Sequence, residues 1–88
     1  MKRIYKYGLS FVSRQIIMLP RDFQILSVKN QNEALEMWAS VDPDKELTER
    51  TILVVNTGDE IWPGREVQFL DTVMLRGGNT LKHVFLVL

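Results

Sequence analysis

Alternation of apolar and polar residues with a period of two most strongly limits what this 88-residue chain can fold into. Residues 35–42 place four apolar side chains on one face of an extended strand: Leu35, Met37, Ala39 and Val41. The other face of that strand carries Glu36, Trp38, Ser40 and Asp42. Similar segments recur along the chain, separated by short stretches of Gly, Pro, Asn or Asp, and this pattern predicts an all-β fold.

We expect about six to seven mainly antiparallel strands and at most one short helical turn. The predicted strands cover residues 3–7, 12–19, 24–29, 35–42, 51–56, 66–75 and 80–88. Residues 44–50 contain good helix formers but are too few for a stable amphipathic helix, so we interpret them as a loop. Residues 57–64 form the longest predicted loop, and residues 76–79 a tight hairpin connection between the last two strands.

The last predicted strand is apolar on both faces. Leu81, Phe85 and Val87 share one face, and Val84 and Leu86 lie on the other. A strand of this kind is covered on both sides. Either the sheet closes into a small sandwich or barrel-like sheet, or a second subunit supplies the cover, and the two can coexist. We therefore expect one β domain over residues 1–88 that forms a homo-oligomer.

Composition excludes several classes of function. The chain is 45% hydrophobic and 25% charged, an ordinary globular composition, and it has no cysteine for disulfides, thiolate metal sites or nucleophiles. Its longest apolar runs, 52–55 and 84–88, are too short to span a membrane, and its start lacks the apolar run of a signal peptide, so we expect a cytoplasmic protein. Eleven basic and eleven acidic residues argue against dedicated nucleic-acid binding.

The balanced charge is segregated along the chain. Residues 1–30 hold six basic side chains and one acidic one, whereas residues 31–60 hold eight acidic side chains and two basic ones. One interpretation is a molecule with a basic and an acidic surface, suited to an anionic ligand or a basic partner. The other is that neighbouring strands pair their charges across the sheet.

No residue pattern indicates catalysis or a bound cofactor. His83 is the only histidine, and we interpret it as a partly buried structural residue whose ring nitrogens find hydrogen-bond partners. The acidic run Asp42–Asp44 lacks the glycine and terminal glutamate of a calcium loop, so no metal is assigned. The glycines match no phosphate-binding motif, and no serine lies in a nucleophile elbow. The sequence therefore predicts a binding protein rather than an enzyme.

The two tryptophans are the strongest indication of a binding surface. Trp38 lies on a polar strand face and Trp62 in a loop, and exposed aromatic residues often mark binding sites. In the structural alternative, the Trp38 ring closes one end of a small barrel or covers a second core. The Trp62 ring is then a hydrophobic anchor that folds its loop back. A pocket that stacks a base and pairs with a phosphate is chemically possible if the tyrosines and arginines available along the chain converge. These are Tyr5, Tyr7, Arg14, Arg50, Arg65 and Arg76. The candidate contact residues are Tyr5, Tyr7, Trp38, Asp42, Trp62, Arg65 and Arg76.

Several short motifs, in this order, resemble a family of small bacteriophage and prophage proteins with no assigned activity. They are residues 4–7 (IYKY), 19–20 (LP), 25–28 (ILSV), 38–43 (WASVDP), 56–58 (NTG) and 83–85 (HVF). The resemblance implies a protein of the host cytoplasm that inhibits host defence by stoichiometric binding of a defence protein or a nucleotide second messenger. The alternative it leaves is a virion or assembly accessory, or a self-associating structural protein without a small-molecule ligand.

Overall fold

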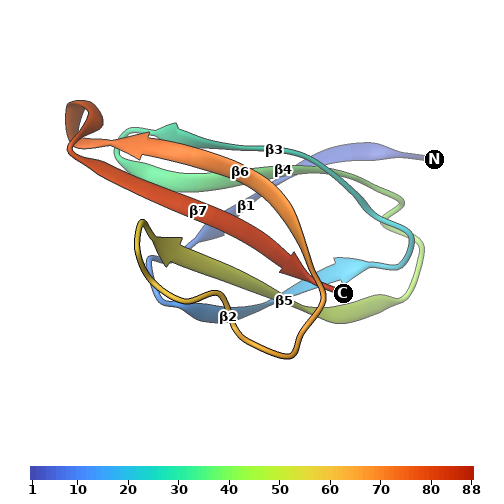
Figure 1. Ribbon diagram of the computed structural model, residues 1–88. Coiled ribbons are helices and arrows are strands. Elements are labelled where there is room, and N and C mark those ends of the chain that lie inside the picture. The colour runs from blue at the N-terminus through green and yellow to red at the C-terminus, as the bar shows by residue number, and fades with distance from the viewer.

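The computed structural model describes residues 1–88 as seven β-strands and one 3-10 turn (Figure 1). The strands are β1 (Arg3–Leu9), β2 (Arg14–Pro20), β3 (Gln24–Gln31), β4 (Ala34–Val41), β5 (Leu47–Asn56), β6 (Val67–Leu75) and β7 (Thr80–Val87). The helical turn η1 covers only Arg76–Gly78. The all-β prediction is confirmed, and the structure has no helix with the length and hydropathy needed to pass through a bilayer.

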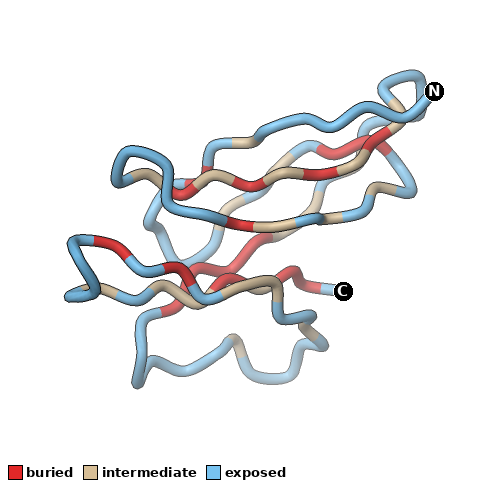
Figure 2. Tube along the Cα trace, turned by 90° about the horizontal axis from the view of Figure 1, so that it is seen from above, coloured by how far each residue is buried: buried red, intermediate tan, exposed pale blue.

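The strands form two antiparallel sheets that face each other (Figures 1 and 2). The small sheet has the order β1-β4-β3 and the large sheet the order β2-β5-β7-β6. The chain crosses between the sheets after β1, β2 and β4, so β1 pairs with β4 and β2 with β5 rather than with their neighbours in sequence. Each sheet keeps two edge strands, and the fold is therefore a sandwich and not a closed barrel.

The main core lies between the two sheets, where Figure 2 shows buried segments in both layers. In β4, the four apolar residues predicted to share a face are all buried, and the alternate residues are only partly buried. Ile52 of β5 and Val84 of β7 are fully buried opposite them. Each of the buried Leu, Ile, Val and Met side chains contributes about 1.5–3 kcal/mol by leaving water. The period-two pattern therefore positions the hydrophobic core as predicted.

A second, smaller core covers the outer face of the large sheet. Leu53, Val55 and Val87 point away from the main core and are buried beneath Trp62 and neighbouring side chains. Trp62 belongs to the loop of residues 57–66, which passes along the outer side of the sheet (Figures 1 and 2). The C-terminal half of β7 is thus covered by the sandwich on one side and by this loop on the other.

The prediction of a loop over residues 44–50 is wrong for its second half, because β5 begins at Leu47 and not at Thr51. Residues 47–50 pair with the end of β2, and the Thr48 hydroxyl donates a hydrogen bond to the Leu19 carbonyl at 2.9 Å. The segment alternates in exposure but carries Glu49 and Arg50, whose charges hide the strand period. Tertiary pairing, and not local preference, makes it a strand.

The edges of the two sheets meet at β3 and β6. The Asp71 carboxylate accepts a hydrogen bond from the Val28 backbone N–H at 3.4 Å and lies 3.8 Å from the Lys29 ammonium. The Asn30 amide donates to the Met74 carbonyl at 3.1 Å. Each strand has a register shift nearby, which bends it locally. These contacts close one lateral side of the sandwich.

Ion pairs join the basic N-terminal block to the acidic block that follows it. The pairs are Arg21–Glu46 at 3.3 Å, Lys45–Asp22 at 2.8 Å and the Met1 amine–Asp42 at 3.6 Å. All lie near the turns at one end of the sandwich. Only Arg21–Glu46 among them joins a basic side chain of residues 1–30 to an acidic one of residues 31–60, so most of the segregated charges form no ion pair with each other.

The Lys45–Asp22 pair should give a small pH dependence of stability. The hydrogen bond from Lys45 and its charge lower the pKa of Asp22, and Asp22 in turn raises the pKa of Lys45. Because the pKa of Asp22 is lower in the folded state, its contribution is present above the unfolded pKa and is lost as the pH falls through the folded one. Urea unfolding of wild type and Lys45→Met should differ slightly at neutral pH and coincide in strong acid. A difference that persists in acid would assign the effect to packing.

Candidate functional site

The structure brings predicted site residues together around Trp62. The guanidinium carbon of Arg65 lies 4.5 Å from the centroid of the Trp62 ring, and that of Arg14 lies 4.1 Å from it. Both are cation–π distances. Arg14, one of the arginines considered for a phosphate contact, is not among the seven candidate contact residues, because only the placement of the 57–66 loop brings it to the tryptophan. The only indication of this contact is that Arg14 lies on the outward face of β2, opposite Leu53.

The turn between Trp62 and Arg65 explains why the Arg65 side chain lies against the Trp62 ring. Pro63 and Gly64 form a turn between them, and Gly64 has φ 75°, a left-handed value that favours glycine. Proline followed by a glycine of positive φ is typical of a type II turn, whose first and fourth residues lie close together. The turn therefore brings the guanidinium of Arg65 over the ring.

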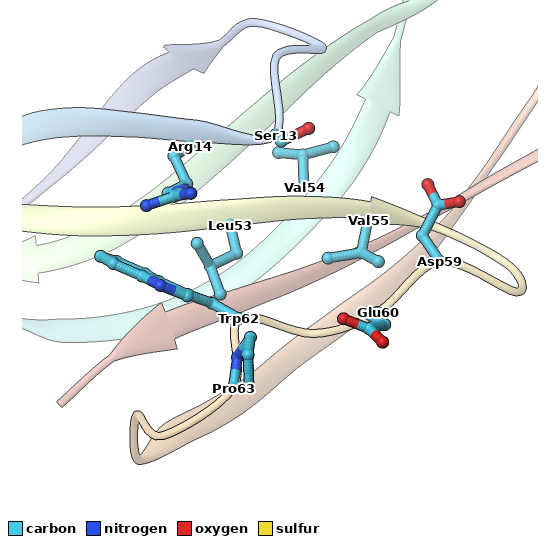
Figure 3. A pocket seen from close by; sticks show the side chains of 9 residues that line it. All are labelled: Ser13, Arg14, Leu53, Val54, Val55, Asp59, Glu60, Trp62 and Pro63. Atoms are coloured by element: carbon cyan, nitrogen blue, oxygen red, sulfur yellow. The ribbon is translucent and has the colours of Figure 1, made fainter.

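Two surface hollows flank Trp62 and Arg14. The first measures about 200 Å³ and is further lined by Ser13, Leu53, Val54, Val55, Asp59, Glu60 and Pro63. The second measures about 420 Å³ and is further lined by Gln15, Ile16 and Thr51. Figure 3 shows the first hollow with Arg14 and Trp62 at one end and the carboxylates of Asp59 and Glu60 at the other. This hollow thus has a basic end, an acidic end and an apolar floor.

The chemistry of this hollow does not favour a nucleotide. Two guanidiniums already lie against the Trp62 ring, so a base could stack there only by displacing one of them. Asp59 and Glu60 line the same hollow and would repel a phosphate. Trp62 also packs on the second core. The ring is therefore a hydrophobic plug over the sheet, as the structural alternative expects, with arginines at its exposed surface.

The predicted aromatic residues of the small sheet lie apart from Trp62. Tyr5 and Tyr7 pair with β4 residues on the inward face, where Tyr7 packs on the main core and Tyr5 stays partly exposed. Burial raises the pKa of Tyr7, and the neighbouring Tyr5 adds to the rise. Trp38 lies on the outward face, opposite Lys6 and Ser27, and belongs to neither core.

Asp42 and Arg76 lie at opposite ends of the sandwich. Asp42 follows β4, where its carboxylate accepts a hydrogen bond from the Asp44 backbone N–H at 3.1 Å and pairs with the N-terminal amine. Arg76 begins the turn between β6 and β7. The seven predicted contact residues thus occupy several separate places: Tyr5 and Tyr7 are neighbours on β1, Trp62 and Arg65 meet in their loop, and the other three lie apart.

His83 has both ring nitrogens engaged. They lie 2.7 Å from the Thr57 hydroxyl and 2.9 Å from the Thr72 hydroxyl, and the ring is partly buried on the outer face of β7. Its interpretation as a satisfied structural histidine is confirmed. No three histidine, aspartate or glutamate side chains gather in an arrangement that could hold a metal ion.

Comparison with known families gives one match. The family model of a domain of unknown function, DUF7352, matches residues 1–88. The chain belongs to the DUF7352 family. No curated protein and no solved structure matches it.

The outer face of the large sheet in this DUF7352 domain is rich in exposed apolar side chains. Strand register places them there, since Ile16 and Met18 of β2 alternate with the inward-facing Ile17 and Leu19. We define the Trp62 face by the residues Arg14, Ile16, Met18, Leu47, Trp62, Arg65, Phe69 and Met74. Five of its side chains are between 45% and 61% exposed: Ile16, Met18, Leu47, Phe69 and Met74.

Proposed function

We propose that this protein is a non-catalytic binding protein that acts by stoichiometric contact with another protein through the Trp62 face. The observation that supports this most is the set of five large apolar side chains exposed on one side of the large sheet. Soluble proteins rarely expose large apolar patches unless they bind something there. Tryptophan, phenylalanine, methionine and arginine, which are enriched at interfaces, are all present on the face.

The charges of the Trp62 face indicate the chemistry of the partner. Neither Arg14 nor Arg65 forms an ion pair within the chain, although both are held in place against Trp62. Ordered cations without a carboxylate partner are suited to meet carboxylates across an interface. We therefore propose a protein partner that presents apolar side chains together with Asp or Glu residues.

The narrower proposal is a phage- or prophage-encoded inhibitor of a host defence protein that acts in the host cytoplasm. The resemblance to phage and prophage proteins supports it, and so does the Trp62 face, whose exposed apolar side chains suit contact with a protein surface better than contact with a nucleotide.

Self-association is the second candidate. An apolar sheet face can bury itself against a second copy across a two-fold axis, and the result would be a homo-oligomer. In such a dimer, Arg14 and Arg65 would meet carboxylates of the second copy, and Asp59 and Glu60, which line the same hollow as Arg14, are candidates for that contact.

The test is a plaque assay in bacteria that each carry one defence system. With wild-type protein, we expect the plaquing efficiency of a restricted phage to rise by orders of magnitude on one host, and the purified effector to co-elute with the protein in fixed stoichiometry. The double variant Ile16→Glu, Met74→Glu should lose both effects, because it places charge on the Trp62 face.

The matched control is Ile4→Glu, at a residue that is 65% exposed on the outer face of the small sheet. It should behave as wild type. Equal loss in the control would overturn the assignment of the face. If no host shows a change, and if sedimentation gives a dimer that the double variant dissociates, self-association replaces the inhibitor proposal.

A further inference from the structure

A separate hollow lies at the end of the sandwich where the β1–β2 connection, the β3–β4 turn and the β6–β7 turn come together, at the left of Figure 1. It measures about 400 Å³, within the range of small-molecule sites. Its lining residues are Phe11, Glu33, Leu75, Arg76, Thr80 and Lys82. None of them belongs to the Trp62 face.

Two cations of this hollow have no carboxylate partner. Neither Arg76 nor Lys82 forms an ion pair within the chain. The Lys82 ammonium donates to the side-chain oxygen of Asn56, which is a neutral acceptor, and lies 5.6 Å from the centroid of the Phe11 ring. The Phe11 ring is 51% exposed, so one aromatic surface is available beside the two positive charges.

The single carboxylate in the hollow, that of Glu33, forms hydrogen bonds that connect two turns. The Glu33 carboxylate accepts the backbone N–H of Arg76 at 2.7 Å through one oxygen and the Asn30 amide at 2.6 Å through the other. Both of its oxygens are therefore used to fasten the β3–β4 turn to the β6–β7 turn. The hollow keeps two positive side chains against one negative one.

The backbone at Arg76 is strained in a way that favours glycine. Arg76 has φ 51°, and Gly77 and Gly78 follow with φ 63° and 97°. A residue with a side chain is disfavoured at such a φ, whereas glycine adopts it freely. Strained residues of this kind concentrate at functional sites, where the side chain is needed. Arg76 stands where local structure alone would prefer a third glycine.

We propose that this hollow, which we call the Arg76 site, binds a small anion that carries a planar ring, of the nucleotide class. Arg76 and Lys82 pair with the anionic group, since a guanidinium matches the geometry of phosphate oxygens. The ring stacks on Phe11. The Arg76 site has one carboxylate against two cations, whereas the hollow beside Trp62 is lined by two carboxylates, so less negative charge opposes an anionic ligand at the Arg76 site. This site goes beyond the proposed protein contact, because it uses other residues at another place.

The test is calorimetric titration of the full chain with AMP, GMP, adenosine and inorganic phosphate. We expect both nucleotides to bind more tightly than either phosphate or adenosine alone, because only they engage the cations and the ring together. Phe11→Ala should weaken the nucleotides but leave phosphate unchanged. Arg76→Gly should weaken nucleotides and phosphate about tenfold or more, through loss of a charge-assisted contact.

Arg76→Gly separates function from folding. Because glycine relieves the backbone strain, this variant should have a thermal midpoint equal to or above that of wild type while it loses affinity. Lys2→Gln, which removes an exposed cation near the N-terminus, is the control and should bind as wild type. The proposal is overturned if neither nucleotide binds at millimolar concentration, if Arg76→Gly binds normally, or if Lys2→Gln loses as much affinity. None of these outcomes affects the plaque assay, which depends on the Trp62 face.

Discussion

Replacing Ile52 with alanine is expected to lower the free energy of unfolding by about 2–5 kcal/mol. Ile52 is fully buried in the main core, and its strand β5 is paired on both sides, with β2 and with β7. The substitution leaves a cavity that the paired strands cannot close. Since a domain of this size has a total stability of about 5–10 kcal/mol, denaturant unfolding should show a much lower midpoint.

The matched control for Ile52→Ala is Ile16→Ala. The two residues are the same type on adjacent strands, but Ile16 is 61% exposed on the Trp62 face. Its replacement should change the free energy of unfolding by less than about 0.5 kcal/mol. Equal losses from the two variants would contradict the placement of the main core between the sheets.

Replacing Trp62 with alanine is expected to lower the free energy of unfolding by about 2 kcal/mol, less than the 3–5 kcal/mol of a fully buried aromatic residue. Trp62 covers Leu53, Val55 and Val87, so its loss exposes the second core to water. Binding of a hydrophobic dye should rise, and proteolysis within loop 57–66 should become faster, while the sheets stay folded. Trp62→Phe should restore most of the stability, because it keeps the apolar cover.

Trp38→Ala is the control for Trp62→Ala. Trp38 belongs to neither core and lies opposite Lys6 and Ser27 on the outer face of the small sheet, where cross-strand contacts contribute about 0.2–1 kcal/mol. Its replacement should affect neither dye binding nor proteolysis of the loop. If Trp38→Ala proves the more destabilising change, Trp62 is not the residue that seals the large sheet.

Most of the fold could be predicted from the sequence because the alternation of burial is local. The period of β4 and the doubly apolar β7 depend only on which side of a strand a residue faces, and both are found as expected. The start of β5 was missed, because residues 47–50 become a strand by pairing with β2 and not by their own preference. The choice between sandwich and barrel likewise depends on long-range pairing that no local pattern encodes.

The candidate sites were harder to predict than the fold. The sequence indicated Trp62 and Arg65 as contact residues, and their turn explains why they meet, since proline and glycine lie between them. Arg14 is far from them along the chain and reaches Trp62 only through the fold. For the same reason Phe11 was not grouped with Arg76 and Lys82, because only the fold brings the β1–β2 connection to the β6–β7 hairpin.

The interleaved strand order has a consequence for how the chain assembles. β1 has no partner until β4 has been made, and β2 has none until β5 follows, so the first two strands cannot pair with what lies next to them. Folds with such distant pairings reach the native state in milliseconds to seconds, and not in microseconds. While the chain is being synthesised, the edges of β1 and β2 stay unpaired and can contact other nascent chains. The hairpins β3–β4 and β6–β7 are the parts able to form first. The order of synthesis is therefore not the order of assembly.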